Sequence, residues 1–522
     1  MPGGETAMKR LIVCCDGTWN NPAKEDNGIP APTNVFKMYN ALADHDARSA
    51  VKQHKYYHPG VGGEGGLLNA IIGGAVGAGI SRHICSAYHW LGSNYEEGDH
   101  IYLFGFSRGA FTARSLGGFL GQGLLNLRNL SSNEAWLRVH RAYEQGYRGK
   151  NATPTDWAEP QWNFFHQGQP APIRFVGVWD TVGALGVPDD LEFLNFFDDK
   201  AKWEFHNTEI GGNVATARHA MALDEIRSCF CVTRWQNAAQ HPDTVELWFP
   251  GAHSDVGGGY AGCDLSNGAL LWMMEESAKT GLKFRDNIQE TIKADPLGAM
   301  HNSYKGLFAK LRSRPRNIEA MLPENHARFH AGAITRQLVS PITHPAYHPT
   351  KILAVGESIA VDIFADTHWN YSSVYLPQGH SFTFSATGQW QDSTDTCDWR
   401  GTENKEMTVG DLIRGAASLF GTLERTFKKL LKNEATDLPG TKRVEKLNWF
   451  TLVGAIANDA GLKQVVGNDG SPVPHQYVEL AAHASAPLTI TAPGYLYCFA
   501  NDAWNFYGNN HGSVQLTIHR VS

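Results

Sequence analysis

Short apolar runs alternate with helical patterns over the first 285 residues of the chain. Apolar residues at helical spacing predict helices over four segments: residues 34–42, 83–95, 215–227 and 265–279. Short runs rich in apolar and aromatic residues predict strands over five others: residues 10–15, 55–58, 101–104, 173–179 and 245–249. Buried strands that alternate with helices favour an α/β fold whose sheet is covered on both faces.

The pattern changes near residues 344–349, and beyond residue 351 it is typical of β structure. Short alternating strands separated by turn residues are predicted over seven segments: residues 358–365, 374–375, 381–386, 449–456, 488–491, 495–500 and 513–518. At 522 residues the chain is too long for one ordinary domain. We therefore expect an α/β domain over residues 1–345 and a β-sandwich over residues 346–522.

One amphipathic helix is predicted within this second half, over residues 409–432. Its apolar stripe fits packing against the sandwich itself. Its basic residues lie mostly beside the stripe, which leaves open a position on a membrane surface.

The clearest candidate chemistry lies at residues 99–116. The apolar run of a predicted strand leads directly into a tight turn, Gly105-Phe106-Ser107-Arg108-Gly109, and residues at helical spacing follow. This is the G-x-S-x-G pattern of a nucleophile elbow, a turn between strand and helix that exposes a serine hydroxyl. Glycines are needed on both sides because the two backbones nearly touch there. The pattern predicts Ser107 as a nucleophile.

Two further residues complete a candidate catalytic triad. Asp180 follows the strand at 173–179, and His253 follows the strand at 245–249 on a glycine-rich loop. The chain order Ser107, Asp180, His253 is the order of α/β hydrolases. Asp255 is a rival acid, but it lies only two residues past the histidine and we expect it to fix the loop. Other histidines lack this combination of strand end and loop, namely His58, His219 and His241.

Other segments are expected to shape the site around the triad. The N–H of Arg108, together with one from near Gly17, would stabilise an oxyanion. Residues 187–213 are irregular and rich in Phe, Asp and Asn, which suits a lid. The glycine-rich stretch at residues 67–80 is either a packed core segment or a surface for an acyl chain.

Composition and charge exclude several classes of protein. The chain has 45 Lys and Arg against 52 Asp and Glu, a net charge of −7, so no nucleic-acid partner is expected despite a basic patch at residues 305–316. No apolar run is long enough for a transmembrane helix, and the first residues lack the apolar core of a signal peptide. The 8 cysteines show no CxxC pair, which is typical of reduced thiols. We expect a protein made in the cytoplasm without a classical signal peptide.

Five collinear segments together resemble one α/β-hydrolase family, first catalogued as a domain of unknown function. They are DGTWN (16–20), GFSRGAFTARSLGGFL (105–120), VWDTVGALGVP (178–188), ALDEIR (222–227) and FPGAHSDVGGGY (249–260). The family includes the family 1 phospholipase effectors of type VI secretion, and the resemblance covers about residues 9–285.

This resemblance implies a serine lipase, a phospholipase of the A type, that releases fatty acid from membrane phospholipids. It implies a triad of Ser107, Asp180 and His253 and no cofactor for catalysis. It also implies an antibacterial effector that a secretion system delivers to a target cell. A secretion-system spike and an immunity protein are the partners that such an effector would have.

The C-terminal stretch at residues 499–518 is similar to the calcium-dependent galactophilic lectin family of pseudomonads. The resemblance implies Ca²⁺ held by Asp502, Asn509 and Asn510, by the backbone carbonyl of Phe506, and by a further carbonyl near residues 390–392. Such oxygens are the hard ligands that Ca²⁺ prefers. The ion would bridge to sugar hydroxyls, so a glycan is a candidate ligand, although the loop at residues 396–404 differs from the sugar-contacting loop of the lectins.

Two functions of other classes stay open. The run Cys14-Cys15-Asp16-Gly17-Thr18 mimics the D-x-D-G-T motif of metal-dependent phosphatases, but Cys14 stands where their nucleophilic aspartate would be. Alternatively, the chain is a calcium-dependent glycan-binding protein with an inactive or weak esterase domain.

Overall fold

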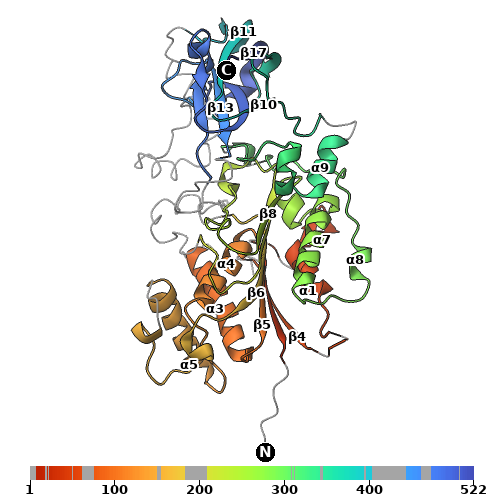
Figure 1. Ribbon diagram of the computed structural model, residues 1–522, viewed down its shortest axis with the longest axis vertical. Helices are drawn as coiled ribbons and strands as arrows, with labels where there is room; N and C mark the ends of the chain where they lie inside the picture. The colour runs from red at the N-terminus through yellow and green to blue at the C-terminus, as the bar shows by residue number, and fades with distance from the viewer. Residues whose placement is uncertain are drawn as a thin grey trace, which may run out of the picture.

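A parallel sheet of six strands forms the centre of the first half of the chain (Figure 1). Its spatial order is β4 (Gln53–His58), β1 (Arg10–Cys15), β5 (His100–Phe106), β6 (Ile173–Trp179), β7 (Ala217–Ala222) and β8 (Thr244–Phe249). The computed structural model describes residues 8–17, 20, 23–46, 48–49, 51–60, 76–149, 154–182, 208–306, 308–310, 312–340, 345–392, 395–402, 442–459, 472–504 and 506–522. Because all six strands are parallel, their carboxyl ends lie along one edge.

Helices cover both faces of this sheet, as the sequence pattern predicts (Figure 1). One face carries α3 (Val76–Asn94), α4 (Arg108–Leu120) and α5 (Ser132–Arg141), and the other carries α1 (Asn34–Ala41) and α7 (Asp264–Lys279). Successive side chains of a strand point to opposite faces. Leu11 and Val13 of β1 thus pack with α3 and α4, whereas Ile12 and Cys14 pack with α1 and α7. This double coverage explains why the central strands β1 and β5 are apolar over nearly their whole length.

Smaller elements connect and extend this domain. They are the hairpin β2 (Glu25–Asp26) and β3 (Ile29–Pro30), a π-helical turn (Ala142–Tyr147), and the short helices α6 (His253–Gly257), α8 (Ile288–Thr291) and α9 (Ala331–Leu338). None of the helices in the described part of the chain combines the length and the apolar character needed to span a bilayer.

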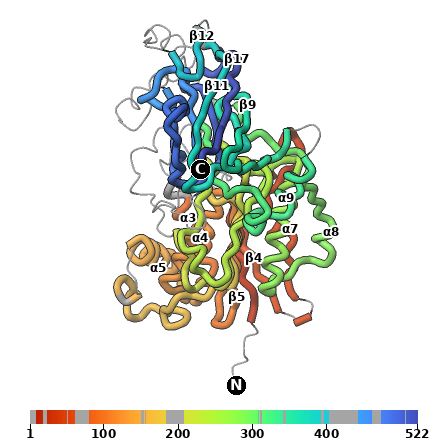
Figure 2. The backbone as a smooth tube through the Cα atoms, turned by 45° about the horizontal axis from the view of Figure 1, so that its top comes forward, coloured from red at the N-terminus to blue at the C-terminus, as the bar shows by residue number. Residues whose placement is uncertain are grey.

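The C-terminal part contains two antiparallel sheets that pack on each other (Figures 1 and 2). One has the order β10 (Asn370–Leu376), β16 (Gly494–Ala500), β13 (Leu452–Asn458) and β14 (Gln476–Glu479). The other has the order β12 (Asp395–Cys397), β11 (Ser381–Asp392), β17 (Asn510–Arg520) and β9 (Ser358–Phe364), with β15 (Leu488–Thr489) beside β11. The sequence predicts most of these strands, with ends that differ by a few residues.

The two central strands of the four-stranded sheet, β16 and β13, are buried on both faces. Along β16, Leu496 and Cys498 point into the core between the two antiparallel sheets. Tyr495 and Phe499 point the other way, into a cluster shared with Trp248 of β8. The hydrophobic contact is therefore continuous between the two halves, and the division at residue 345 stays a prediction.

One predicted helix is wrong. Residues 215–227 contain the strand β7, whose six residues are all buried between β6 and β8. Alanine favours a helix in isolation, but small side chains also fit a central strand covered on both faces, and tertiary burial overrides the local preference here. Three other predictions lie wholly or mostly outside the described residues. They are the glycine-rich stretch at 67–80, of which residues 76–80 begin α3, the lid at 187–213 and the helix at 409–432.

Candidate functional site

Ser107 lies at a strained turn where β5 meets α4. Its backbone has φ 58° and ψ −126°, a region that residues other than glycine rarely adopt. The two glycines of the motif allow the close approach that this turn requires. A Cβ on Gly105 would lie 2.3 Å from the carbonyl oxygen of Gly109, and a Cβ on Gly109 would lie 2.2 Å from that of Cys15. The local geometry is that of a nucleophile elbow.

Asp180 and His253 are brought together across the carboxyl edge of the sheet. Asp180 directly follows Trp179, the last residue of β6. The carbonyl of Trp179 accepts a hydrogen bond from the N–H of Ser107 at 3.1 Å, so the ends of β5 and β6 lie side by side. His253 begins α6, just beyond β8. Its Nδ1 donates to Asp180 Oδ2 at 2.6 Å, so the predicted acid and base form a buried hydrogen-bonded pair.

The surroundings of this pair favour a neutral imidazole beside an ionised carboxylate. The His253 ring packs against the rings of Phe106 and Phe230, with centroids 4.5 and 4.9 Å away. Burial lowers the pKa of His253, and the charge of Asp180 opposes that effect. Burial alone would raise the pKa of Asp180, but Arg316 and His253 hold it well below its usual range. A neutral imidazole is the form that can accept a proton.

The hydrogen bond between serine and histidine that would complete a triad is not formed among the described residues. Among the described residues, no hydrogen bond joins the Ser107 hydroxyl to His253, although Ser107 directly follows Phe106, whose ring contacts the imidazole. Catalytic hydrogen bonds are often long before substrate binds and shorten only in the complex. The structure therefore places the three predicted residues at one edge and joins two of them.

The loop before His253 is held by two carboxylates of the ALDEIR segment. Asp224 Oδ2 accepts the N–H of Gly251 at 2.6 Å, and Glu225 Oε2 accepts the N–H of His253 at 3.2 Å. The sequence predicts His253 on a glycine-rich loop, but it is the first residue of the short helix α6. Asp255 accepts the N–H of Ala252 and a hydrogen bond from the ring of His301, so it fixes the loop and is not the acid of the pair.

The two predicted oxyanion donors differ in their surroundings. Arg108 is the first residue of α4, where backbone N–H groups have no acceptor within the helix. Gly17 lies against the serine, since a Cβ on it would be 3.1 Å from Ser107 Cβ. The N–H of Gly17, however, donates to Asp16 Oδ1 at 2.7 Å. The N–H of Gly17 itself thus has an acceptor, and a second oxyanion donor from near Gly17 stays a prediction.

Asp16, the candidate of the phosphatase alternative, is saturated by hydrogen bonds. Besides the Gly17 N–H, its carboxylate accepts the hydroxyls of Thr33 at 2.6 Å and Tyr57 at 2.7 Å. These bonds tie the end of β1 to α1 and β4. In the described part of the chain, no three His, Cys, Asp or Glu side chains gather as a metal site would require.

The candidate calcium residues lie together between β16 and β17. Asn510 Nδ2 donates to Asp502 Oδ2 at 2.9 Å, and both side chains are buried. Asn510 Oδ1 is buried without a hydrogen-bond partner among the described residues, which leaves an amide oxygen for a cation. The backbone of Asn510 pairs with Asp392, so the end of β11 lies beside the set, as the resemblance implies. Phe506 and Asn509 lie in the connecting turn, where the Phe506 carbonyl accepts the Asn509 N–H. The residues present therefore fit Ca²⁺.

Sequence reasoning missed the partners that complete this site. Arg316 lies in the basic patch at residues 305–316 and forms a two-pronged ion pair with Asp180, at 2.7 and 2.9 Å. Phe230, which packs on His253, lies in no recognised motif. Glu225 was within reach, because it belongs to a segment of the family resemblance.

A parallel sheet with a strained serine and a carboxylate–imidazole pair at its carboxyl edge defines an α/β hydrolase-like domain. The chain belongs to the family of the type VI secretion phospholipase effectors that are Tle1-like, whose catalytic-domain model matches residues 9–276.

Individual relatives are more distant. The uncharacterized protein YEL023C of Saccharomyces cerevisiae (strain ATCC 204508 / S288c) is 25% identical over an alignment of 439 residues, and the match covers 58% of this chain and 61% of that protein. The chain thus spans less than two thirds of that relative.

Two solved structures also show partial similarity. The Tle1 effector bound to the VgrG spike from the Type 6 secretion system is 21% identical, with a TM-score of 0.30, over 48% of this chain and 51% of that one. The PllA-like lectin domain of EclA is 16% identical, with a TM-score of 0.16, over 31% of this chain and 94% of that one. TM-scores of this size support no conclusion.

We expect Gly109→Ala to destabilise the α/β domain by about 2 kcal/mol or more, because its methyl group would overlap the backbone of Cys15 and Asp16. Gly117→Ala, in the same helix, is the matched control. Its methyl group would meet only Ile173 and Leu103, at 3.7 and 3.9 Å, and it should stabilise the helix slightly. Calorimetric unfolding of both variants checks this, and equal melting temperatures would contradict the close approach at the elbow.

Proposed function

We propose that the chain is a serine phospholipase of the A type, which hydrolyses carboxylic esters of membrane phospholipids. The observation that carries the proposal is the buried Asp180–His253 hydrogen bond at 2.6 Å beside the strained Ser107 turn. The family supports phospholipid as the substrate class.

In this mechanism His253 Nε2 accepts the Ser107 proton while the serine oxygen attacks the ester carbonyl. The imidazolium then gives that proton to the alcohol oxygen of the departing lysophospholipid, which leaves an acyl-enzyme. Water hydrolyses the acyl-enzyme by the same two proton transfers and releases the fatty acid. Asp180 orients the imidazole and stabilises its charged form, and the Arg108 N–H at the start of α4 stabilises the oxyanion.

The same family supports a wider biological proposal. The protein is an antibacterial effector that a type VI secretion system delivers to a target cell. A secretion-system spike is the candidate partner for export, and an immunity protein is the candidate partner that protects the producing cell. The solved Tle1 effector is described as bound to the VgrG spike.

A second proposal concerns the C-terminal domain, which we propose to be a lectin-like sandwich that holds Ca²⁺ and through it a glycan. Asp502, Asn509, Asn510 and the Phe506 carbonyl would hold the ion. The unpartnered and buried Asn510 Oδ1 favours this assignment. If the ester-hydrolysing proposal fails, calcium-dependent glycan binding is the alternative function of the chain.

Ser107→Ala should abolish release of fatty acid from mixed phospholipid vesicles, because it removes the attacking oxygen while the fold tolerates a small side chain at the turn. Lipid mass spectrometry of the products measures this and identifies the acyl position cleaved. Ser93→Ala, on helix α3, is the control and should keep full activity. Fatty-acid release by Ser107→Ala at the wild-type rate would refute the proposal.

Ca²⁺ should raise the melting temperature of the C-terminal domain, because a ligand that binds only the folded state stabilises it. Asp502→Asn should abolish the calcium-dependent rise by removing the charged ligand. Asp362→Asn, an exposed position of β9, should leave the rise unchanged. Thermal unfolding with CaCl₂ and with a chelator checks this. Identical melting temperatures of the wild type in both buffers would exclude the calcium site.

A further inference from the structure

Arg316 is a buried guanidinium in contact with the candidate catalytic acid. Resting on the proposed function, we propose that Arg316 is a positioning residue, which orients the Asp180 carboxylate and balances its charge, and that the C-terminal domain holds Arg316 in place.

The Asp180 carboxylate has four donors and is fully buried. Its Oδ1 accepts the N–H of Ala222 at 2.8 Å and Arg316 Nη1 at 2.7 Å. Its Oδ2 accepts Arg316 Nη2 at 2.9 Å and His253 Nδ1 at 2.6 Å. A planar guanidinium that bonds both oxygens fixes the plane of the carboxylate, and with it the direction in which Oδ2 meets the imidazole.

Arg316 also holds an aromatic residue that packs on the imidazole. Its Nη2 donates to the carbonyl of Phe230 at 2.7 Å, and the Phe230 ring packs on His253. One side chain therefore holds both the acid and an aromatic wall of the base.

The segment that carries Arg316 is bonded to the C-terminal domain on both sides of this residue. We name residues 312–321 the strap. Asn317 Nδ2 donates to the carbonyl of Val473 at 2.8 Å, and Trp369 Nε1 donates to Ser313 Oγ at 2.9 Å. The N–H of Met321 donates to the Tyr495 hydroxyl at 2.8 Å.

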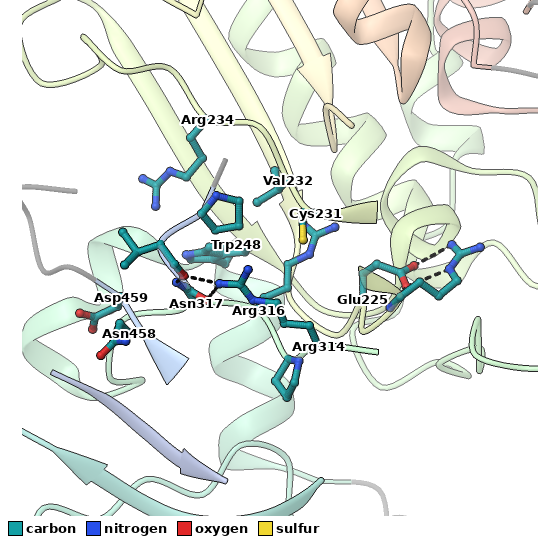
Figure 3. Close-up of a pocket in the computed structure, with 14 residues that line it drawn as sticks. Glu225, Cys231, Val232, Arg234, Trp248, Arg314, Arg316, Asn317, Asn458 and Asp459 are labelled. Atoms are coloured by element: carbon teal, nitrogen blue, oxygen red, sulfur yellow. Dashed lines mark hydrogen bonds and ion pairs between the residues drawn. The ribbon is translucent and has the colours of Figure 1, made fainter. Parts of the chain in front are cut away.

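A small cavity lies between the strap and the C-terminal domain (Figure 3). Arg314, Arg316 and Asn317 of the strap line it together with Asn458 and Asp459 of the C-terminal domain. Arg316 thus lies between the catalytic edge and the domain interface, which is where a residue must lie if one domain is to position the acid of the other.

The charged groups around Asp180 and His253 determine the direction in which loss of Arg316 should shift the pH dependence. Glu225 and Arg227 also face His253, but they are paired with each other at 2.7 Å. His219 and Cys231 face Asp180, and burial lowers the pKa of His219 and raises that of Cys231, so both are neutral near pH 7. Arg316 is therefore the cation that balances Asp180 among the described residues.

Without this cation, the Asp180–His253 pair would bind a proton more tightly, because the carboxylate charge would act on the imidazole alone. The reaction needs the neutral imidazole. Its acid limb, the pH range in which the rate falls as the imidazole becomes protonated, should then move to higher pH.

The test uses a serine-directed fluorophosphonate on the full chain, which reports Ser107 activation without any lipid substrate. The second-order rate of labelling is measured from pH 4 to 9. In Arg316→Met we expect the acid limb to move up by about one pH unit. Arg218→Met is the matched control, because it removes another buried guanidinium that pairs with carboxylates, those of Glu276 and Asp243, and does not contact Asp180 or the strap. Its acid limb should stay at the wild-type position.

Arg316→Lys covers the case in which Arg316→Met does not fold. It keeps the charge but lacks the planar pair of N–H groups that fixes the plane of the carboxylate, so the plateau rate should fall about tenfold while the acid limb stays in place. The inference is overturned by an Arg316→Met profile with the wild-type limb, or by an Arg316→Lys plateau equal to that of the wild type. A wild-type protein that the probe does not label at all would instead refute the serine mechanism of the proposed function.

Discussion

A negative charge without access to water must be balanced inside the protein, and the Asp180 carboxylate imposes that constraint on this fold. Leaving such a charge unpaired would cost several kcal/mol. Its four donors come from three places: a neighbouring strand end, the start of α6 and the strap. The sheet, the short helix after β8 and the contact between the domains must therefore all form for Asp180 to stay ionised. An ionised Asp180 in turn is what keeps His253 in one tautomer and orientation.

Much of the α/β domain follows from local sequence because its requirements are local. Ser107 and Asp180 come directly after a buried strand, and His253 comes a short loop after another. The carboxyl ends of parallel strands meet at one edge, so strand prediction alone brings the three together. The glycines at 105 and 109 are required by backbone contacts within the elbow and with β1. Strand β7 shows the limit. Its alanines and Met221 favour a helix in isolation, and only the neighbours β6 and β8, with the C-terminal sheet behind, make it a strand.

The rest of the site depends on contacts that no local pattern encodes. Arg316 is 136 residues from Asp180 in the chain and lies outside any helix or strand. A run of basic residues is more often solvated, and nothing in its spacing distinguishes the one guanidinium that is buried. For Gly17, by contrast, the sequence predicts the position but not the hydrogen bond of its N–H. Its place beside Ser107 follows from the strand order, but its hydrogen bond to Asp16 depends on the side-chain rotamer, which the sequence does not specify.

The two faces of the four-stranded C-terminal sheet decide how the domains can influence each other. Tyr495 and Phe499 pack against the α/β domain, while Leu496 and Cys498 on the same strand pack within the sandwich. Separating the domains would expose one of these faces to water, at a cost of about 25 cal/mol for each Å² of apolar surface. For one domain to change the geometry of the other, some element at their interface must have two discrete arrangements. A closely packed interface deforms little. The bonds of the strap to Val473, Trp369 and Tyr495 therefore support Arg316 and, through its ion pair, the Asp180 carboxylate.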